Sequence, residues 1–410
     1  MYDLTLAQNA GIDAFGLDIA AGDSNVPNSV ATAFAAAAAM SGRTIKLYLI
    51  FDYSAWGAWS ADNVISYINT YSRSAVYFNY TGKPLVSTFE GTGNTGDWTS
   101  IKASTNCFFV PDWSSLGAGT AASYSSIDGL ASWNAWPEGP NNLTTSDDQY
   151  YQTSLGSKAY MMPVSPQFYT NLPQYSKNWL WYSDSLWHLR WLATLSVGPQ
   201  FIQIISWNDY GESHYIGPIR PSGVVSGAWY VDSAHPHTAW LDFLPLYISA
   251  YKTGSSTVLT SSSSSSSPSS AAAADDALTY WYKSNPVSSG DTASTVCNNA
   301  AYQTTYPPAT CAADNIFFTV NLVAPATISV SVGSSTLQSV YAASAGLSHF
   351  GIPTAAATGK VVFTVTRDGV STLSVTGQTD ITSMSLTDGY VNWNYVVGSS
   401  SSSSSSTSSS

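Results

Sequence analysis

The chain has 410 residues, of which only 9% are charged, and its formal net charge is −12. A chain of this length can form two or three domains, each with its own hydrophobic core. Acidic chains with few Lys and Arg repel polyanions, so neither nucleic acid nor an anionic membrane surface is expected as a partner. No apolar run is long enough to span a bilayer, and no signal peptide is recognisable at Met1.

The first part of the chain alternates apolar runs typical of buried strands with segments of helical periodicity. The expected strands cover residues 12–19, 45–52, 84–90, 107–112, 129–134, 160–164 and 201–206. Helical patterns cover residues 31–40, 61–71, 184–195 and 237–252. The first of these follows Asp23-Ser24-Asn25 and Pro27, which together are a helix-start signal.

Alternation of this kind predicts an α/β fold with a parallel sheet and helices outside it. The chain starts in a helical pattern, and its seven expected strands are one short of the eight that close a (β/α)8 barrel. We therefore expect a TIM-type barrel whose first strand would precede Met1. An open doubly wound sheet is the alternative, but the Gly-rich dinucleotide fingerprint of that fold is not found.

Composition changes twice after the expected barrel. We expect a catalytic-type barrel domain at 1–254, a Ser/Ala-rich linker at 255–276, an accessory domain at 277–398 and a Ser-rich tail at 399–410. Segments 316–320, 327–332 and 360–365 alternate apolar and polar residues, which predicts a small antiparallel β-sandwich. Its aromatic residues Trp281, Tyr282, Tyr341 and Trp393 would permit ligand binding.

Cysteines, N-glycosylation sequons and Ser tracts bear on the localisation of the protein. Cys297 and Cys311 are close enough in sequence to form a disulfide, whereas Cys107 opens an apolar run and is expected to be a buried thiol. Asn79 and Asn142 begin N-glycosylation sequons. Together with the Ser tracts, these features favour a secreted or cell-wall protein, with an amino terminus that was trimmed or assigned too late.

Polar or aromatic residues stand at the ends of several expected strands. They are Asp52, Glu90, Asp112, Trp133-Asn134, Ser165 and Asp209. Each one alone could be a loop cap or a surface charge. Burying several carboxylates without a role would be costly, so their repetition predicts one shared cleft at the rim of the barrel, where barrel enzymes keep their chemistry.

The most distinctive stretch follows the seventh expected strand and reads Ser206-Trp207-Asn208-Asp209-Tyr210-Gly211-Glu212-Ser213-His214. With segments 45–52, 83–89, 109–117, 132–137, 162–166 and 206–217, the chain resembles the fungal α-1,3-glucanases (mutanases) of glycoside hydrolase family 71. The resemblance extends from residue 2 to about residue 254. It implies a (β/α)8 barrel and an endo-acting, inverting hydrolase of α-1,3-glucan. At the front of the chain, nothing matches the strand with a His-Phe-like motif that begins the family's barrel.

By resemblance, Asp209 and Glu212 are the catalytic carboxylates, and Asp52 is implicated with them. An inverting glycosidase needs an acid to protonate the leaving oxygen and a base to activate water, about 6.5–9.5 Å apart. We expect Glu212 to be the acid, Asp209 the base and Asp52 a positioning group, with the reverse order of acid and base left open. The acid must have a raised pKa, which burial against aromatic rings or a neighbouring carboxylate would give.

Aromatic rings that stack on sugar faces and polar groups that bond hydroxyls are expected around these acids. The substrate-binding candidates are Glu90, Asp112, Trp113, Trp133, Asn134, Tyr169, Trp207, Asn208, Tyr210 and His214. Trp56, Trp136 and Trp181 are further ring candidates, and about half of all these rings are expected to be core. His214 could equally be a structural histidine. No metal or cofactor and no oligomer is expected, and the alternative function is a non-catalytic wall protein that binds glucan through a degenerate barrel.

Overall fold

The computed structural model describes residues 1–258, 275–383 and 389–400. The chain forms two compact units. Unit 1 comprises Met1–Ala135, Thr145–Pro163 and Val197–Gln203, and unit 2 comprises Trp136–Thr144, Val164–Ser196 and Ile204–Ser410. Most of the expected Ser-rich linker and tail lies outside the described residues. The expected domain limits at 254, 276 and 398 therefore remain predictions.

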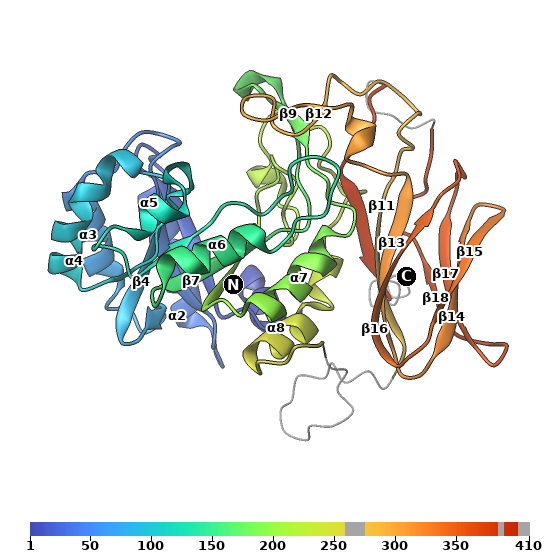
Figure 1. The fold of residues 1–410 in the computed structure, drawn as a ribbon, viewed down its shortest axis with the longest axis horizontal. Helices are drawn as coiled ribbons and strands as arrows, with labels where there is room; N and C mark the ends of the chain where they lie inside the picture. The colour runs from blue at the N-terminus through green and yellow to red at the C-terminus, as the bar shows by residue number, and fades with distance from the viewer. Residues whose placement is uncertain (259–274, 384–388, 401–410) are drawn as a thin grey trace. The chain divides into compact units, whose positions relative to one another are not determined.

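Unit 1 is built on a sheet of parallel strands with helices beside it (Figure 1). One run pairs β1 (Ala14–Ala20), β2 (Lys46–Asp52), β4 (Lys83–Phe89) and β5 (Phe108–Phe109), and the hairpin strand β3 (Asn79–Tyr80) adds antiparallel to β4. A second run joins β6 (Gly129–Ala131), β7 (Ala159–Val164) and β10 (Phe201–Ile204). Single bridges from Phe89 to Asp112 and from Asp112 to Ala131 link the two runs.

The helices of unit 1 follow the expected alternation. They are α1 (Tyr2–Asn9), α2 (Val26–Ala39), α3 (Ala61–Tyr71), α4 (Trp98–Thr105), α5 (Ala118–Ala122) and α6 (Ser146–Leu155). Helix α3 buries Val64 and Ile68, and the side chain of Ser60 caps its first turn by accepting a hydrogen bond from the Asn63 amide. The predicted α/β class with parallel strands is confirmed, whereas closure into a barrel remains an expectation.

Two strands of unit 1 are shorter than predicted. The segment 107–112 pairs regularly only over Phe108–Phe109, because Pro111 has no amide hydrogen to give to a ladder. The segment 129–134 stops pairing at Ala131, and the amide of Trp133 donates instead to the hydroxyl of Ser114 at 3.2 Å. The missing donor in the first strand and the local hydrogen bond in the second thus shorten strands that the apolar pattern predicts to be longer.

The single helix predicted over residues 237–252 is wrong. The structure has a 3₁₀ turn, η5 (Thr238–Leu241), and then a separate helix α8 (Leu244–Lys252). Pro245 lies in the first turn of α8, where its missing amide hydrogen costs nothing, whereas a continuous helix would have needed that donor. The helix predicted at 184–195 is found as α7 (Leu186–Val197).

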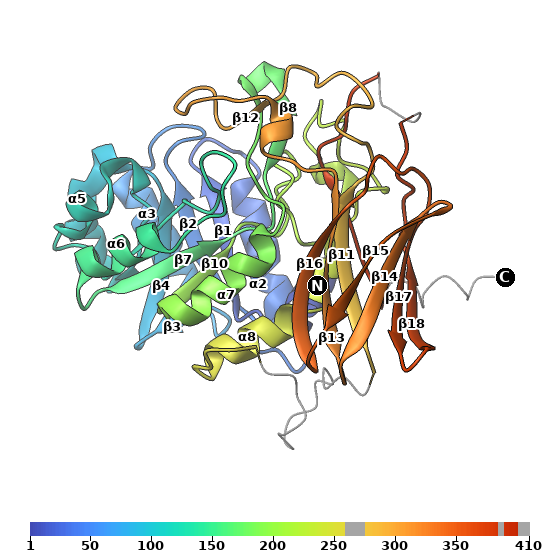
Figure 2. The ribbon, with the colours of Figure 1, turned by 45° about the vertical axis from the view of Figure 1, so that its right-hand side comes forward.

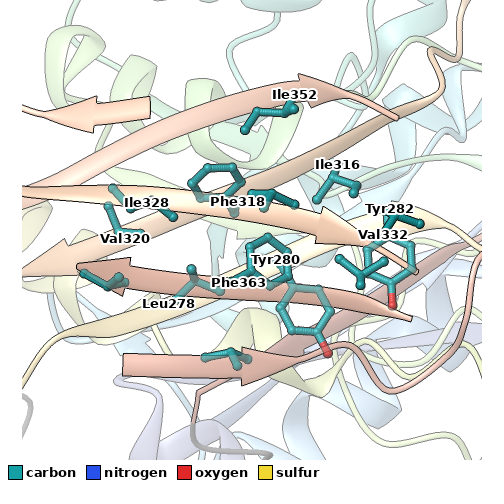
Figure 3. Packing of buried hydrophobic residues seen from close by; sticks show 14 of the residues in the cluster. Leu278, Tyr280, Tyr282, Ile316, Phe318, Val320, Ile328, Val332, Ile352 and Phe363 are labelled. Carbon is teal, nitrogen blue, oxygen red and sulfur yellow. The ribbon is translucent and has the colours of Figure 1, made fainter. Parts of the chain in front are cut away.

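Unit 2 contains two antiparallel four-stranded sheets that share one apolar core (Figure 2). The strands of the first sheet are, in order, β16 (Gly346–Pro353), β13 (Asn315–Leu322), β11 (Ala277–Lys283) and β19 (Tyr395–Ser399). Those of the second are β15 (Ser335–Ala342), β14 (Ala326–Val332), β17 (Val361–Arg367) and β18 (Val370–Thr376). Side chains such as Phe318, Val320, Ile328 and Phe363 meet between the sheets (Figure 3). The predicted antiparallel sandwich is therefore present.

Three of the four aromatic residues expected to be available on the sandwich are core residues. Trp281, Tyr282 and Trp393 are at most 2% exposed, whereas Tyr341 is 65% exposed. Strand β11 is buried on both of its faces, which explains the burial of Trp281 and Tyr282.

A small sheet of unit 2 was not predicted. Strands β8 (Tyr169–Leu172) and β9 (Lys177–Leu180) form an antiparallel hairpin across the turn at Pro173–Tyr175, and β12 (Val296–Cys297) adds to it in parallel. Cys297 is joined to Cys311 by a disulfide whose Cα atoms are 5.6 Å apart, and Cys107 is a buried free thiol. The disulfide thus joins the loop that follows β12 to β12 itself.

Asn79 and Asn142 both lie at exposed positions, as glycosylation would require. Glycosylation and secretion remain predictions. In the described part of the chain, the structure contains no helix with the length and hydropathy needed to cross a bilayer.

Candidate active site

The distinctive stretch of the sequence forms a loop that leaves β10 and returns alongside itself. The amide of Ser206 donates to the carbonyl of His214 at 2.9 Å, and the amide of Gly217 donates to the carbonyl of Trp207 at 2.8 Å. A side chain at Gly217 would meet Trp207 at 2.6 Å, so the close approach of the two arms requires glycine. The loop tip therefore carries Asp209, Glu212 and His214 together.

These three side chains form one cluster within unit 2. One ligating atom from each lies within 4.8 Å of the others. The Nε2 atom of His214 is 3.0 Å from a Glu212 oxygen and 3.8 Å from an Asp209 oxygen. The other Asp209 oxygen accepts a hydrogen bond from the Glu212 amide at 2.9 Å. The two carboxyl groups are thus neighbours on one turn, as the sequence indicated.

Both carboxylate oxygens of Glu212 have partners. Oε1 lies 2.5 Å from the ammonium of Lys177, at the start of β9, and Oε2 lies 3.0 Å from His214 Nε2. Burial opposes ionisation of Glu212, but the His214 and Lys177 side chains outweigh it and lower the pKa of Glu212 to about 2. Glu212 is therefore an anion, which is the opposite of what the expected acid role requires.

Asp209 has the opposite tendency. Partial burial and the adjacent Glu212 carboxylate raise the pKa of Asp209, although His214 and Lys177 act against them. Its side chain is 44% exposed, compared with 17% for Glu212. Asp209 is therefore the more accessible of the two carboxyl groups and the better able to hold a proton.

Aromatic rings enclose His214 on the protein side. Its ring lies 5.4 Å from the ring of Trp136 and 5.7 Å from that of Phe168, measured between centroids. Trp136 in turn stacks on Trp181 at 5.3 Å. Because an ionised Glu212 can only accept, Nε2 of His214 carries a hydrogen, and Nδ1 bonds the hydroxyl of Ser206 at 2.9 Å. The imidazole is therefore held at both nitrogens. His214 thus bonds a carboxylate and is also a buried structural histidine, the two interpretations that the sequence left open.

The remaining candidates of unit 2 divide into exposed and buried residues. Asn208 is exposed and Trp207 is partly exposed, so both are accessible beside the acids. Tyr210 and Tyr169 are at most 2% exposed, and this contradicts the expectation that their rings stack on a ligand. The hydroxyl of Tyr210 donates to the carbonyl of Pro218 at 2.8 Å, and the ring of Tyr169 packs 4.7 Å from that of Tyr230. These two tyrosines stabilise the loop from inside.

In unit 1, three of the predicted acids stand at strand ends, as expected. The Asp52 carboxylate accepts hydrogen bonds from the amides of Ser54 and Ala55 at 2.6 and 3.1 Å. Glu90 accepts from the amide and the hydroxyl of Ser115. Loop capping is therefore at least one role of both, and a catalytic role for Asp52 remains a prediction.

Asp112 differs from the other strand-end acids because it is buried, with 1% of its surface exposed. One oxygen accepts from the amide and the hydroxyl of Ser114, while Oδ2 has no hydrogen-bond partner among the residues that the structure describes. Burial raises the pKa of Asp112 to about 7; the bonds from Ser114 lower it, and the charges of Glu90 and Asp18 raise it. The Asp112 side chain is therefore not accessible to a substrate.

The aromatic candidates of unit 1 also divide. Trp113 is 1% exposed and packs edge-on against Phe109 and Tyr124, so its ring is core and the expected stacking role is contradicted. Trp133 is partly exposed beside Phe89, and Asn134 is exposed and bonds the Asp147 carboxylate. Trp56 is 67% exposed, so its ring is accessible to a ligand.

The donor set of Asp209, Glu212 and His214 would suit a cation by geometry alone. Lys177 already places its ammonium on Glu212 and would repel a second cation there. The cluster is thus explained by its own ion pairs. Lys177 is the member of this cluster that the sequence did not indicate, because the hairpin that carries it has no legible strand pattern.

The chain is similar to known proteins along most of its length. The family model for glycosyl hydrolase family 71 matches residues 1–410. A mutanase of Penicillium rubens is 32% identical over 97% of this chain and 84% of its own length. A glucan endo-1,3-alpha-glucosidase of Schizosaccharomyces pombe is 35% identical over 94% of this chain and 87% of its own length. Among solved structures, a GH99 endo-alpha-mannosidase from Bacteroides thetaiotaomicron is 16% identical, with a TM-score of 0.47 over 62% of this chain and 83% of that chain. The chain belongs to glycosyl hydrolase family 71.

Proposed function

We propose that the protein hydrolyses α-1,3-glucosidic bonds in α-1,3-glucan. Membership of the family and the names of the two fungal relatives support this substrate. The observation that carries the chemistry is the pairing of a carboxyl group with a raised pKa, Asp209, and an anionic carboxylate, Glu212, on one turn. Environments that push the pKa values of two neighbouring acids apart are typical of glycosidase acid–base pairs.

In this proposal Asp209, and not Glu212 as expected from the sequence, is the proton donor. Its exposed carboxyl group gives its proton to the glycosidic oxygen as the bond to the anomeric carbon breaks. Glu212 stays ionised, keeps the pKa of Asp209 high by its charge, and fixes His214. His214 and Lys177 hold Glu212 in the anionic form, so they position this arrangement without taking part in the proton transfer.

The base that activates water comes, in our proposal, from outside this pair. An oxygen of Asp209 lies within 4.8 Å of an oxygen of Glu212. An inverting pair needs room for a water molecule, about 6.5–9.5 Å between the carboxyl groups. The resemblance also implicates Asp52, for which a positioning role is expected from the sequence. If the reaction inverts, NMR of the first product will show the β-anomer at the newly formed reducing end.

Lys177→Met is expected to move the alkaline limb of the pH–activity profile to higher pH. The Lys177 ammonium lowers the pKa of Asp209, so its loss leaves Asp209 protonated to higher pH. The measurement is kcat between pH 4 and pH 8 on soluble α-1,3-linked glucooligosaccharides. Lys158→Met, which removes a lysine from unit 1, is the control and should leave the limb in place. A shift to lower pH would refute the assigned roles.

The test of the function is release of reducing sugar from insoluble α-1,3-glucan by the full chain. We expect soluble products from this polymer and none from amylose or from β-1,3-glucan. Binding to the polymer without any product would instead support the non-catalytic wall protein. Equal release from amylose would show that the α-1,3 linkage is not what the site selects.

A further inference from the structure

We propose that Asn394, which directly precedes strand β19, is a positioning residue for the turn that carries Asp209 and Glu212. The proposal rests on the catalytic role proposed above for that turn. Asn394 bonds neither acid and acts through Gln167, Tyr215 and Tyr230. The last strand of the sandwich then belongs to the catalytic apparatus, and the sandwich is more than a spacer or a separate binding module.

The backbone of the turn is held on both sides of Glu212 by buried side chains. The hydroxyl of Tyr230 donates to the carbonyl of Gly211 at 2.6 Å. The side-chain amide of Gln167 donates to the carbonyl of Ser213 at 2.8 Å. Both side chains are essentially buried, so neither bond competes with water. The backbone of Glu212 therefore lies between two fixed carbonyls.

Asn394 ties these two supports together. Its Oδ1 accepts from the Gln167 amide at 2.5 Å, and its Nδ2 donates to the Tyr230 carbonyl at 3.1 Å and to the Tyr215 hydroxyl at 3.2 Å. Tyr215 directly follows His214. An Asn side chain has two N–H donors, and both are used here. The Asn394 side chain therefore bonds Tyr230 and Gln167, which hold the carbonyls of Gly211 and Ser213. It also bonds Tyr215, the residue after His214.

The orientation of Asn394 is itself fixed from the sandwich. Its own amide donates to Oδ1 of Asn392 at 2.9 Å, and Nδ2 of Asn392 donates to the Tyr230 carbonyl at 3.2 Å. Strand β19 starts at the next residue and pairs with β11, from Tyr395 opposite Lys283 onward. A buried network in which every member is satisfied specifies one arrangement, whereas the loss of one member leaves its neighbours unpaired. Removing the Asn394 amide would free Gln167 to turn away from Ser213.

The experiment compares Asn394→Ala with Val396→Ala in the full chain. Val396 is equally buried two residues later, but it belongs to the core between the two sheets. On soluble α-1,3-linked glucooligosaccharides we expect Asn394→Ala to lower kcat about 10- to 100-fold with KM within about two-fold of the wild type, since small misplacements of reacting groups have effects of this size. Val396→Ala should lower the melting temperature yet keep kcat within about two-fold.

A second variant keeps the proposal testable if Asn394→Ala does not fold. Tyr230→Phe keeps the ring and removes only the hydroxyl that donates to Gly211, and it should lower kcat about 10-fold at unchanged KM. A folded Asn394→Ala or Tyr230→Phe protein with wild-type kcat would overturn the positioning role. A wild-type protein that releases nothing from these oligosaccharides would instead overturn the proposed function.

Discussion

Asp209→Asn is expected to lower kcat on α-1,3-linked glucooligosaccharides by about 10³-fold, within the range of 10²–10⁴ that general acid catalysis contributes. The amide has the shape of the carboxyl group and can still accept the bond from the Glu212 amide, but it has no acidic proton to give to the leaving oxygen. The loop should therefore keep its geometry while the chemical step slows. Circular dichroism and thermal melting of the variant should match the wild type.

Glu212→Gln distinguishes the roles of the two carboxyl groups by the direction in which the pH profile of kcat shifts. Because the Glu212 charge raises the pKa of Asp209, its removal should move the alkaline limb of the kcat profile to lower pH, in addition to lowering kcat. The assigned roles would be falsified if Glu212→Gln abolished turnover on substrates with an ordinary leaving group yet kept full rate on one that needs no protonation. That pattern is the signature of a missing acid, and we expect it for Asp209→Asn instead.

The clustering of Asp209, Glu212 and His214 on one turn was predictable because these residues are close in sequence. Asp209, Glu212 and His214 lie within six residues, and the glycine between the acids indicated a turn that lets them meet. Lys177 and Asn394 were not predictable, because each reaches the turn through contacts that are distant in sequence. His214, which is local, and then Lys177 lower the pKa of Glu212, so only the part that comes from Lys177 was hidden from the sequence.

The same distinction holds for the fold. The strands of unit 1 follow from apolar runs, and the sandwich follows from alternation such as that of β14, where every second residue is buried. The hairpin of β8 and β9 escaped prediction because Tyr169–Leu172 is buried on both faces and shows no alternation. Trp113 and Tyr169 are large rings whose burial is decided by neighbours from other segments, so composition alone could not separate a stacking platform from core.

Asp112→Asn is expected to make the protein more stable at neutral pH relative to acid pH, by up to about 4 kcal/mol, from about three pKa units at 1.36 kcal/mol each. The pKa of Asp112 in the folded state, about 7, lies above the ordinary value of 3.8. For an acid, a raised pKa means that the native state binds the extra proton, so stability is lost as pH rises from about 4 to about 7. Asparagine does not titrate and keeps an acceptor for Ser114, so it removes this loss.

The measurement is the free energy of unfolding of wild type and variant at pH 4 and pH 8, taken as a double difference. Any cost of the unpartnered amide in the variant is the same at both pH values and cancels. Asp62→Asn, at an exposed position on α3 of the same unit, removes an equal charge and controls for net charge. Because Asp112 bridges the two runs of strands in unit 1, its protonation stabilises the middle of the sheet. Parallel pH dependence in wild type and Asp112→Asn would show that this carboxyl group is already ionised in the fold, and that its Oδ2 has found a partner.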